Sequence, residues 1–395
     1  MNPNDAVIVS ACRTPLGGFL GSLAPVDAVS LGSLVIAEAI RRAGVDKEQV
    51  EEVIMGQVLP CGCGQNPARL AMLKAGLPFE TGALTINKVC GGGLKAVMLA
   101  AQAIRAGDSH IIIAGGMESM SNAPYYMERA RTGYRMGNAK IIDHMVHDGL
   151  WDVVNDFHMG ISNDIICTDY NISREDQDRY AEMTYARAMN SIATGRFKEE
   201  IVPVEIPGKK GAVTVFDTDE NPRETSYEIL SKMKPAFQKQ GFATAGNSSV
   251  IADGASALCV MSRRKAEELG VTPLASIVAY GSSGLELKYV LIAPIKSIPK
   301  ALGIAGLSVK DIELHEVNEA FSGSTLCVQR ELGIDQEICN VNGGAVALGH
   351  PIGCSGARVL TTLLHEMPRR GATLGQASLC LGGAESVTMI VKREA

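Results

Sequence analysis

The stretch NKVCGGGLKA, residues 87–96, places Cys90 directly before three glycines and an alanine-rich run. The run from Val97 to Ala106 has the composition of a buried helix, and a helix begins with backbone N–H groups that have no partner within it. The helix dipole favours negative charge at that end, so we expect it to shift Cys90 toward the thiolate, below the usual pKa of about 8.5. The glycines leave room for a substrate carbonyl to approach the sulfur. The stretch therefore predicts a nucleophilic cysteine before a helix, with a buried structural cysteine as the alternative.

Strand and helix patterns alternate around this stretch through residues 1–118. Residues 6–9 and 53–56 are apolar and strand-like, and residues 29–43 have helical spacing that ends at Gly44. Residues 110–114 predict a buried strand that stops at the glycines 115–116. Such alternation indicates helices packed on a mostly parallel sheet.

The texture of the sequence changes between residue 117 and about residue 247. Regular periodicity weakens through residues 121–156. Ser173 and Asp176 form a Ser-x-x-acid helix start, and residues 177–193 predict a polar, exposed helix. Prolines then separate short strand-like or loop pieces. Because structureless loops of this length are uncommon unless they are functional, we interpret the segment as one long insertion built over the core.

A second α/β unit begins near residue 270 and repeats features of the first. Residues 300–312 resemble residues 38–50, residues 356–359 resemble residues 93–96, and residues 382–386 resemble residues 115–119. Three matches in the same order and at similar separation indicate one fold used twice rather than a solenoid. We therefore divide the chain into an N-terminal core half (1–118 with 248–269), an inserted loop domain (119–247) and a C-terminal core half (270–395).

Composition and charge argue against several classes of protein. The 395-residue chain has a net charge of −6 and no basic stripe, which argues against a nucleic-acid partner. No apolar run reaches the length of about 18 residues that a membrane span needs, and a strand pattern follows the N-terminus too closely for a signal peptide. The ten cysteines are dispersed, as reduced cytoplasmic thiols are, so we expect a cytoplasmic protein. Nothing completes a zinc site around Cys61 and Cys63, and we expect no bound metal.

Three more stretches in the second half carry polar or nucleophilic groups beside glycines. Residues 340–358, NVNGGAVALGHPIGCSGAR, surround His350 with glycines before a helix, and histidine can act as a base near neutral pH. Asn318 follows an apolar strand in HEVNEAF, residues 315–321, and Cys380 ends a strand in SLCLGG, residues 378–383. Taken alone, His350 could be a hydrogen-bonded structural residue and Cys380 a strand-core thiol.

Together these four stretches resemble the thiolase family, and the resemblance covers essentially the whole chain. The motifs VCGGGLKA, NEAF, GHPIGCSGAR and the C-x-G-G ending occur in the family's order, and residues 65–69, 115–121 and 244–247 agree as well. The resemblance implies an α/β fold of duplicated βαβαβαββ halves in a layered αβαβα core with a long inserted loop domain. Residues 122–125, 143–149 and 158–160 look more like short-chain acetoacetyl-CoA thiolases than long-chain β-oxidation enzymes.

The resemblance implies a reversible Claisen condensation of two acetyl-CoA molecules. Cys90 would be the nucleophile and His350 its base, giving an acetyl-cysteine intermediate. Cys380 would remove a proton from the second acetyl-CoA, and the enolate charge would be stabilised by His350 and by a water held by Asn318. The backbone N–H groups of Cys90 and Gly382 would stabilise the tetrahedral intermediate. Coenzyme A thioesters would be the substrates, and no metal or bound cofactor would be needed.

The resemblance also places the coenzyme A site largely in the insertion. It implies Arg223 at the adenine end, His158 and Ser249 at the pantetheine, and Leu150, Met159, Ala320 and Phe321 in the acyl pocket. Each of these could instead be a solvated charge, a cap or a core residue. Related tetramers place a tetramer-forming loop where Arg129, Arg131 and Arg135 stand, which implies a homotetramer.

Three positions depart from the family pattern, and two other functions stay open. The family usually ends in C-x-G-G-G-x-G, whereas here Ala384, Glu385 and Ser386 follow the two glycines and could shift the backbone around the thiol. Val250 replaces a glycine that is common after Ser249. The alternatives are a degradative 3-ketoacyl-CoA thiolase of broader chain length and a catalytically silent scaffold subunit of an acyl-transfer complex. A ketoacyl synthase would share the fold but lacks a second catalytic cysteine.

Overall fold

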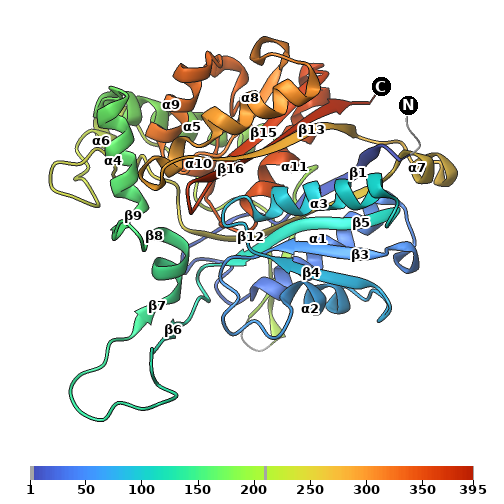
Figure 1. Cartoon of the computed structure of the whole chain (residues 1–395), viewed down its shortest axis with the longest axis horizontal. Coiled ribbons are helices and arrows are strands. Elements are labelled where there is room, and N and C mark those ends of the chain that lie inside the picture. The colour runs from blue at the N-terminus through green and yellow to red at the C-terminus, as the bar shows by residue number, and fades with distance from the viewer. Residues whose placement is uncertain (1–3, 209–210, 395) are drawn as a thin grey trace.

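A computed structural model describes residues 4–208 and 211–394 of the chain (Figure 1). The first half of the fold alternates strands and helices and ends on a strand that follows the insertion. Its main elements are β1 (Ala6–Arg13), α1 (Ala28–Ala43), β3 (Glu52–Gly56), α2 (Pro67–Lys74), β4 (Gly82–Ile86), α3 (Gly92–Ala106), β5 (Ile111–Ser119) and β12 (Ala252–Ser262). Its strands lie in the order β4-β3-β5-β12-β1, with β3 parallel to both β4 and β5. The short β2 (Gly17–Gly18) pairs with β12, and α7 (Arg263–Leu269) leads to the second half.

The second half repeats this arrangement with one strand shortened. Its elements are β13 (Ala275–Gly284), α8 (Pro294–Ala305), β14 (Leu314–Val317), α9 (Ser322–Leu332), α10 (Ala345–Leu348), α11 (Ser355–Arg370), β15 (Leu374–Leu381) and β16 (Glu385–Arg393). The strand order β14-β15-β16-β13 matches β3-β5-β12-β1 of the first half. A single parallel bridge between His315 and Cys339 stands where the first half has β4. The duplicated α/β fold predicted from the sequence repeats is therefore confirmed.

The two halves join in one ten-stranded sheet and enclose a central pair of helices. The strands β1 and β13 meet through two antiparallel pairs, Val7 with Ser276 and Ile8 with Ala275. Between the strands of the two halves lie α3 and α11, which pack on each other and on the sheet (Figure 1). The helices α1 and α2 cover the outer face of the first half, and α8 covers the outer face of the second. The result is the layered αβαβα core.

Glycines set the distance between the two central helices. A Cβ atom at Gly93 of α3 would lie 2.6 Å from the backbone nitrogen of Ala357, and one at Gly356 of α11 would lie 2.4 Å from that of Leu94. The N–H of Gly93 donates to the carbonyl of Gly353 at 3.1 Å. Only residues without a side chain allow the two backbones to approach this closely. The helices therefore begin side by side.

The expectation of a mostly parallel sheet is wrong: among the described strands, β1–β12, β1–β13, β5–β12, β13–β16 and β15–β16 pair antiparallel, and only β3–β4, β3–β5 and β14–β15 pair parallel. Two further expectations are wrong in detail. The strand expected to stop at the glycines 115–116 continues to Ser119 as β5, because these glycines lie within the sheet where other backbones come close. A Cβ at Gly116 would lie 2.1 Å from the Gly353 carbonyl oxygen. Helix α5 (Arg174–Ala193) is not simply exposed, because one face of it is buried against the core. That face carries polar side chains, including Thr184, whose hydroxyl hydrogen-bonds the buried carboxylate of Glu319.

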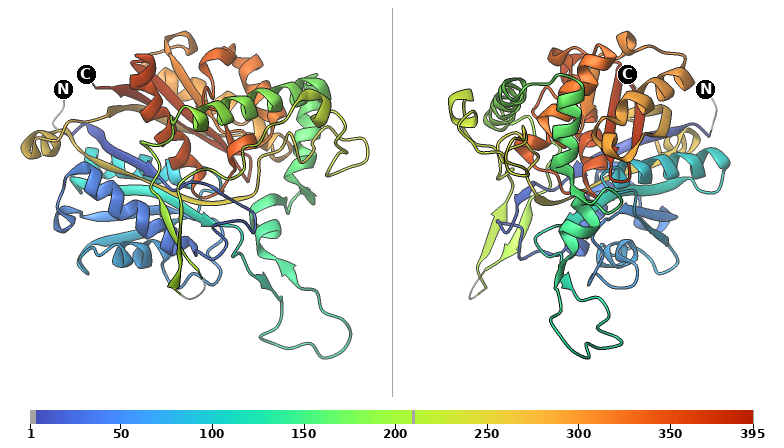
Figure 2. Two further views of the ribbon diagram at one scale, coloured as in Figure 1. Left: turned by 180° about the vertical axis from the view of Figure 1, so that it is seen from behind. Right: turned by 60° about the vertical axis from the view of Figure 1, so that its left-hand side comes forward.

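The insertion between β5 and β12 contains short elements and two long helices. These are β6 (Tyr125–Tyr126), β7 (Ile142–Asp143), a π-helical turn (Met145–Leu150), β8 (Trp151–Asp152), β9 (Phe157–His158), α4 (Met159–Asp169), α5, β10 (Val204–Pro207), β11 (Val213–Phe216) and α6 (Tyr227–Leu230). Short 3-10 helices elsewhere lie at Lys47–Gln49, Leu287–Ile292, Val309–Asp311 and Gln336–Ile338. The loop between β6 and β7 extends away from the rest of the molecule in both views of Figure 2. Its residues 127–141 are exposed.

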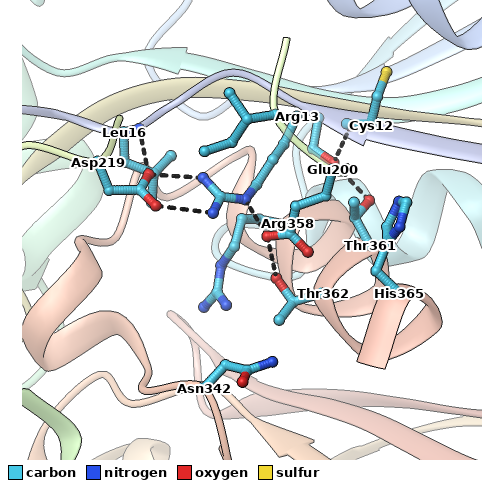
Figure 3. Close-up of polar contacts among 12 residues, drawn as sticks. Cys12, Arg13, Leu16, Glu200, Asp219, Asn342, Arg358, Thr361, Thr362 and His365 are labelled. Carbon is cyan, nitrogen blue, oxygen red and sulfur yellow. Dashed lines mark hydrogen bonds and ion pairs between the residues drawn. The ribbon is translucent and has the colours of Figure 1, made fainter. Parts of the chain in front are cut away.

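A buried arginine fastens the insertion to the core. Arg13 of β1 donates from Nε to Glu200 at 2.6 Å and from both terminal nitrogens to Asp219 at 2.7 and 2.9 Å (Figure 3). Asp219 also accepts the N–H of Leu16, and Glu200 accepts the hydroxyl of Thr362 on α11. Removing one partner of such a buried pair typically costs about 3–5 kcal/mol, because the other charge stays buried.

Of the described helices, none combines the length and apolarity needed to cross a membrane.

Two glycine-to-alanine changes, one at the contact between α3 and α11 and one on the surface of α8, should have opposite effects on the free energy of unfolding. Gly356→Ala should lower the free energy of unfolding by about 1–3 kcal/mol, because its methyl group meets the backbone of Leu94. Gly303 lies on the exposed side of α8, where an added Cβ would meet no described atom within 4 Å, so Gly303→Ala should raise the free energy of unfolding by about 0.5–1 kcal/mol. Urea unfolding of both variants measures the two changes. Equal effects would show that the helix contact has room for a methyl group.

Candidate active site

The residues that sequence analysis singled out lie where chain segments enter and leave the central layer. Cys90 stands between β4 and α3, and His350 stands between α10 and α11. Cys380 is near the end of β15, and Gly382 and Asn318 directly follow β15 and β14. The carboxyl ends of strands and the N-termini of helices meet here, which is where open α/β folds bind their ligands. Residues far apart in the sequence thus come together at one end of the central helices.

Most of the predicted site residues line one cavity of about 490 Å³. Those in the lining are Cys90, Leu150, His158, Met159, Arg223, Ser249, Ala320, Phe321, His350, Cys380 and Gly382, and Asn318 lies outside it. Sequence analysis did not single out several further lining residues, among them Phe19, Met120, Phe237, Val290, Leu291 and Ile352. These are apolar residues in ordinary core-like patterns, so no local sequence signal distinguishes them from core.

The pantetheine and acyl-pocket candidates form an apolar wall. The His158 ring stacks on Phe237 with the ring centroids 4.5 Å apart, and its Nδ1 accepts the N–H of Gly160. Burial lowers the pKa of His158, so this ring is favoured in its neutral form. Leu150 ends the π-helical turn, and the N–H of Ser249 donates to the carbonyl of Ala320 at 3.1 Å. Exposed Arg223 lies over the ring of Tyr185, 4.9 Å from its centroid.

Hydrogen bonds fix the tautomer of His350. Its Nδ1 lies 2.6 Å from the hydroxyl oxygen of Ser355, and that hydroxyl donates its hydrogen to the carbonyl of Pro351 at 2.9 Å. Because the hydroxyl hydrogen is used there, the Ser355 oxygen accepts from His350, whose proton must sit on Nδ1. Nε2 of the neutral ring is then left with a lone pair and can accept a proton. Ser355 lies within the quoted GHPIGCSGAR motif, but its sequence position alone does not reveal this role.

His350 and Cys90 are both neutral before any ligand binds. Burial and the nearby Arg358 cation lower the pKa of His350 to about 3. Burial raises the pKa of Cys90 to about 11, although hydrogen bonds from the N–H groups of Gly382 and of Cys90 itself oppose the rise. The expectation that the helix start would favour the thiolate is therefore wrong for the free protein, since loss of water outweighs the backbone donors. Both shifts disfavour an ion pair between the cysteine and the histidine before a ligand binds.

Cys380 and Asn318 are two further buried residues of the candidate site. Cys380 is 3% exposed, and burial raises its pKa further above its ordinary value, with a smaller contribution from Cys90. Asn318 is buried, and neither its side-chain oxygen nor its nitrogen has a hydrogen-bond partner within the described residues. Buried amides are almost always paired, so these two atoms can hold a water or a ligand. The described chain has no cluster of three or more His, Cys, Asp or Glu residues able to hold a metal ion.

Comparison with known proteins gives consistent matches over almost the full chain. Residues 6–264 match "Thiolase, N-terminal domain" and residues 271–393 match "Thiolase, C-terminal domain". Proteins named acetyl-CoA acetyltransferase from Pseudomonas aeruginosa and Cupriavidus necator are each 52% identical to the chain over 391 residues. The Pseudomonas match covers 99% of this chain and 100% of that protein. The crystal structure of the Bacillus anthracis acetyl-CoA acetyltransferase superposes with a TM-score of 0.97 at 40% identity, covering 99% of both chains.

The neutral cysteine predicts a steep pH dependence of alkylation. A pKa raised to about 11 keeps the thiol protonated below that pH, so the thiolate fraction of Cys90 grows about tenfold per pH unit. The rate of its alkylation by iodoacetamide should therefore rise without a plateau from about pH 7 to about pH 10. Peptide mapping separates this label from that on exposed Cys61, and Cys90→Ser provides the control. A rate that levels off near neutral pH would mean that Cys90 and His350 form an ion pair.

Proposed function

The chain belongs to the thiolase family, and from this premise we propose that it condenses two acetyl-CoA molecules to acetoacetyl-CoA and coenzyme A, reversibly. The observation that carries the proposal is the convergence of two cysteines and one histidine, Cys90, Cys380 and His350, on a single cavity. A ketoacyl synthase would not need Cys380. Full-length relatives that bear the name acetyl-CoA acetyltransferase support the same reaction. The substrates are coenzyme A thioesters, and the reaction uses no bound cofactor.

In the first half-reaction, Cys90 attacks the thioester carbonyl of acetyl-CoA. Nε2 of His350 takes the thiol proton as the carbon–sulfur bond forms and returns it to the leaving sulfur of coenzyme A. The product is acetyl-Cys90. The N–H groups of Gly382 and Cys90 already donate to the sulfur, so they lie within reach of the negative oxygen that develops beside it. Each such donor is typically worth about 3–4 kcal/mol.

In the second half-reaction, Cys380 removes a proton from the methyl group of the second acetyl-CoA. His350 first accepts the Cys380 proton, which leaves a thiolate and an Nε2–H that donates to the enolate oxygen. A water held by the unpaired amide of Asn318 donates to the same oxygen. The enolate carbon attacks acetyl-Cys90 and expels its sulfur, which takes the proton back from His350. Cys380 keeps the proton from the methyl group, so the site returns to its starting state.

The remaining site residues act in binding. Leu150, Met159, Ala320 and Phe321 form the apolar wall around a short acyl group. His158 and Ser249 contact the pantetheine arm, and Arg223 at the exposed rim faces the adenine end. In this proposal residues 119–247 form the inserted domain that carries most of the coenzyme A site. The core halves 1–118 with 248–269 and 270–395 carry the reacting groups.

The proposal extends to assembly and location. The chain acts as a homotetramer, in which the protruding loop with Arg129, Arg131 and Arg135 contacts other subunits. That loop also exposes Met136, at 95%, and Ile141, at 66%, which is unusual unless a partner covers them. We place the protein in the cytoplasm, where the ten described cysteines would stay reduced. A role in fatty-acid metabolism follows from the proposed reaction. Sedimentation equilibrium should give four times the chain mass of 41.8 kDa, and a monomer would contradict the assembly.

The first test is thiolysis of acetoacetyl-CoA by coenzyme A beside the same assay with a 3-ketohexadecanoyl-CoA. Fast cleavage of the short substrate with little cleavage of the long one is expected, because the full-length relatives bear the name acetyl-CoA acetyltransferase. Cys90→Ser should reduce the rate about a thousandfold or more, since the nucleophile is lost. Loss of acetoacetyl-CoA absorbance measures both rates.

A second variant separates the two half-reactions. Cys380→Ala should still gain one acetyl group on Cys90 from acetyl-CoA, as seen by mass spectrometry, while condensation is lost. Stronger cleavage of the long substrate would instead assign the protein to degradation of longer ketoacyl chains. No activity on either substrate, with folded protein and an unreactive Cys90, would favour a silent scaffold.

A further inference from the structure

An ion pair connects the loop before Cys90 to the hairpin after Cys380. Nζ of Lys88 contacts Oε2 of Glu385, and the two residues are 297 positions apart in the chain. Lys88 stands two residues before the nucleophile. Glu385 stands three residues after Gly382, whose N–H donates to the sulfur of Cys90. The pair therefore joins the two segments that carry the thiol and its backbone donor.

The two segments also pack directly on each other. The side chain of Val89 lies against Gly382, since a Cβ there would be 3.0 Å from Val89 Cγ1. Leu381 covers Gly91, where a Cβ would lie 2.4 Å from Leu381 Cδ2. Any movement of the hairpin relative to the Cys90 loop would therefore move Gly382 relative to the sulfur.

Both segments hold backbone conformations that side chains disfavour. Val89 has φ +45° and Ala384 has φ +60°, and neither is a glycine. A β-branched residue in this region is rare, and such positions cost about 1–3 kcal/mol unless their surroundings hold them. The N–H of Leu285 donates to the Ala384 carbonyl at 2.8 Å, and the Asn87 side chain accepts the N–H of Val89 at 2.9 Å. The Lys88–Glu385 pair adds a contact that joins the two segments directly.

A second lysine, Lys95, lies near the Lys88–Glu385 ion pair. Lys95, on the first turns of α3, lies near enough to Lys88 and Glu385 to feel both charges, and burial with the Lys88 charge lowers the pKa of Lys95. The Lys88–Glu385 pair thus lies near a second ammonium group, that of Lys95. Without Glu385 the two ammonium groups would repel each other and push the Lys88 side chain outward.

We propose that the Lys88–Glu385 pair is a positioning device that holds the N–H of Gly382 against the sulfur of Cys90. The proposal rests on the function proposed above, in which this N–H stabilises the negative oxygen of the tetrahedral intermediate. Neither Lys88 nor Glu385 lines the cavity that holds the proposed reacting groups. Small displacements of such a donor reduce the rate of the chemical step more than they reduce substrate binding.

A double-mutant cycle tests the pair with Glu385→Gln, Lys88→Met and the double variant. Each single change should lower kcat for acetoacetyl-CoA thiolysis about fivefold, with KM within about twofold of wild type. The double variant should be no slower than either single variant, because each alone already breaks the pair. Glu268→Gln is the matched control, since Lys265 and Glu268 form a pair of similar exposure on the distant helix α7. It should leave kcat unchanged.

Three outcomes would overturn the proposal. Wild-type kcat in both single variants would show that the pair holds nothing that matters. Rate losses that multiply in the double variant would show that the two residues act separately. Opposite effects of Lys88→Met and Glu385→Gln would show that their charges act on the sulfur through space rather than through the hairpin.

The rate of Cys90 alkylation separates this proposal from the proposed function. It needs no acyl-CoA, and the single variants should react several-fold more slowly than wild type at one fixed pH, because the thiolate loses its Gly382 donor. Inactive wild-type protein with this alkylation pattern would remove the proposed function and leave the pairing in place. Equal alkylation in all four proteins would overturn the pairing whether or not the enzyme is active.

Discussion

The site depends on how closely α3 and α11 approach each other. Gly93 and Gly356 let the two helix backbones touch, and the N–H of Gly93 reaches the carbonyl of Gly353 at the start of α11. Each helix comes from a different half of the duplicated fold. Since Cys90 precedes one helix and His350 precedes the other, the contact that joins the halves also places the proposed nucleophile and its proposed base in one cavity. Neither half can provide both groups, so the duplication itself creates the chemistry.

The same contact explains why the reacting groups are neutral at rest. Helix starts would favour a thiolate, yet the site lies deep between two layers of sheet, where loss of water raises the pKa of Cys90 to about 11 and lowers that of His350 to about 3. A neutral pair avoids a permanently exposed nucleophile. In the proposed first half-reaction, proton transfer to His350 therefore accompanies the attack by Cys90. Ser355 contributes by holding the proton of His350 on Nδ1.

Sequence analysis singled out Cys90, His350 and Cys380, which line one cavity, because they stand in short motifs beside glycines, where chemistry and backbone approach leave a local signal. It predicted the alternation of strands and helices and the duplication from the same local patterns. It failed where the outcome depends on distant partners. Gly116 lies within β5 where the backbone of Gly353 packs closely against it. Helix α5 buries a polar face because Thr184 on it hydrogen-bonds the buried carboxylate of Glu319. The pKa of Cys90 was misjudged because burial is not visible in a ten-residue stretch.

A buried ion-pair network positions the insertion on the core. Buried Arg13 holds Glu200 and Asp219 of the insertion against β1, and Thr362 of α11 shares Glu200 with it (Figure 3). Burying these charges costs solvation free energy, and apolar side chains of similar size could stabilise such an interface as well. What they could not supply is direction, because a guanidinium bonded to two carboxylates at about 2.6–2.9 Å fixes both chain segments in orientation as well as distance. An insertion that must bring Arg223 and His158 to a cavity built by the core needs that orientation. The duplicated core brings Cys90, His350 and Cys380 to one cavity, and the charged contacts orient the insertion that completes its lining.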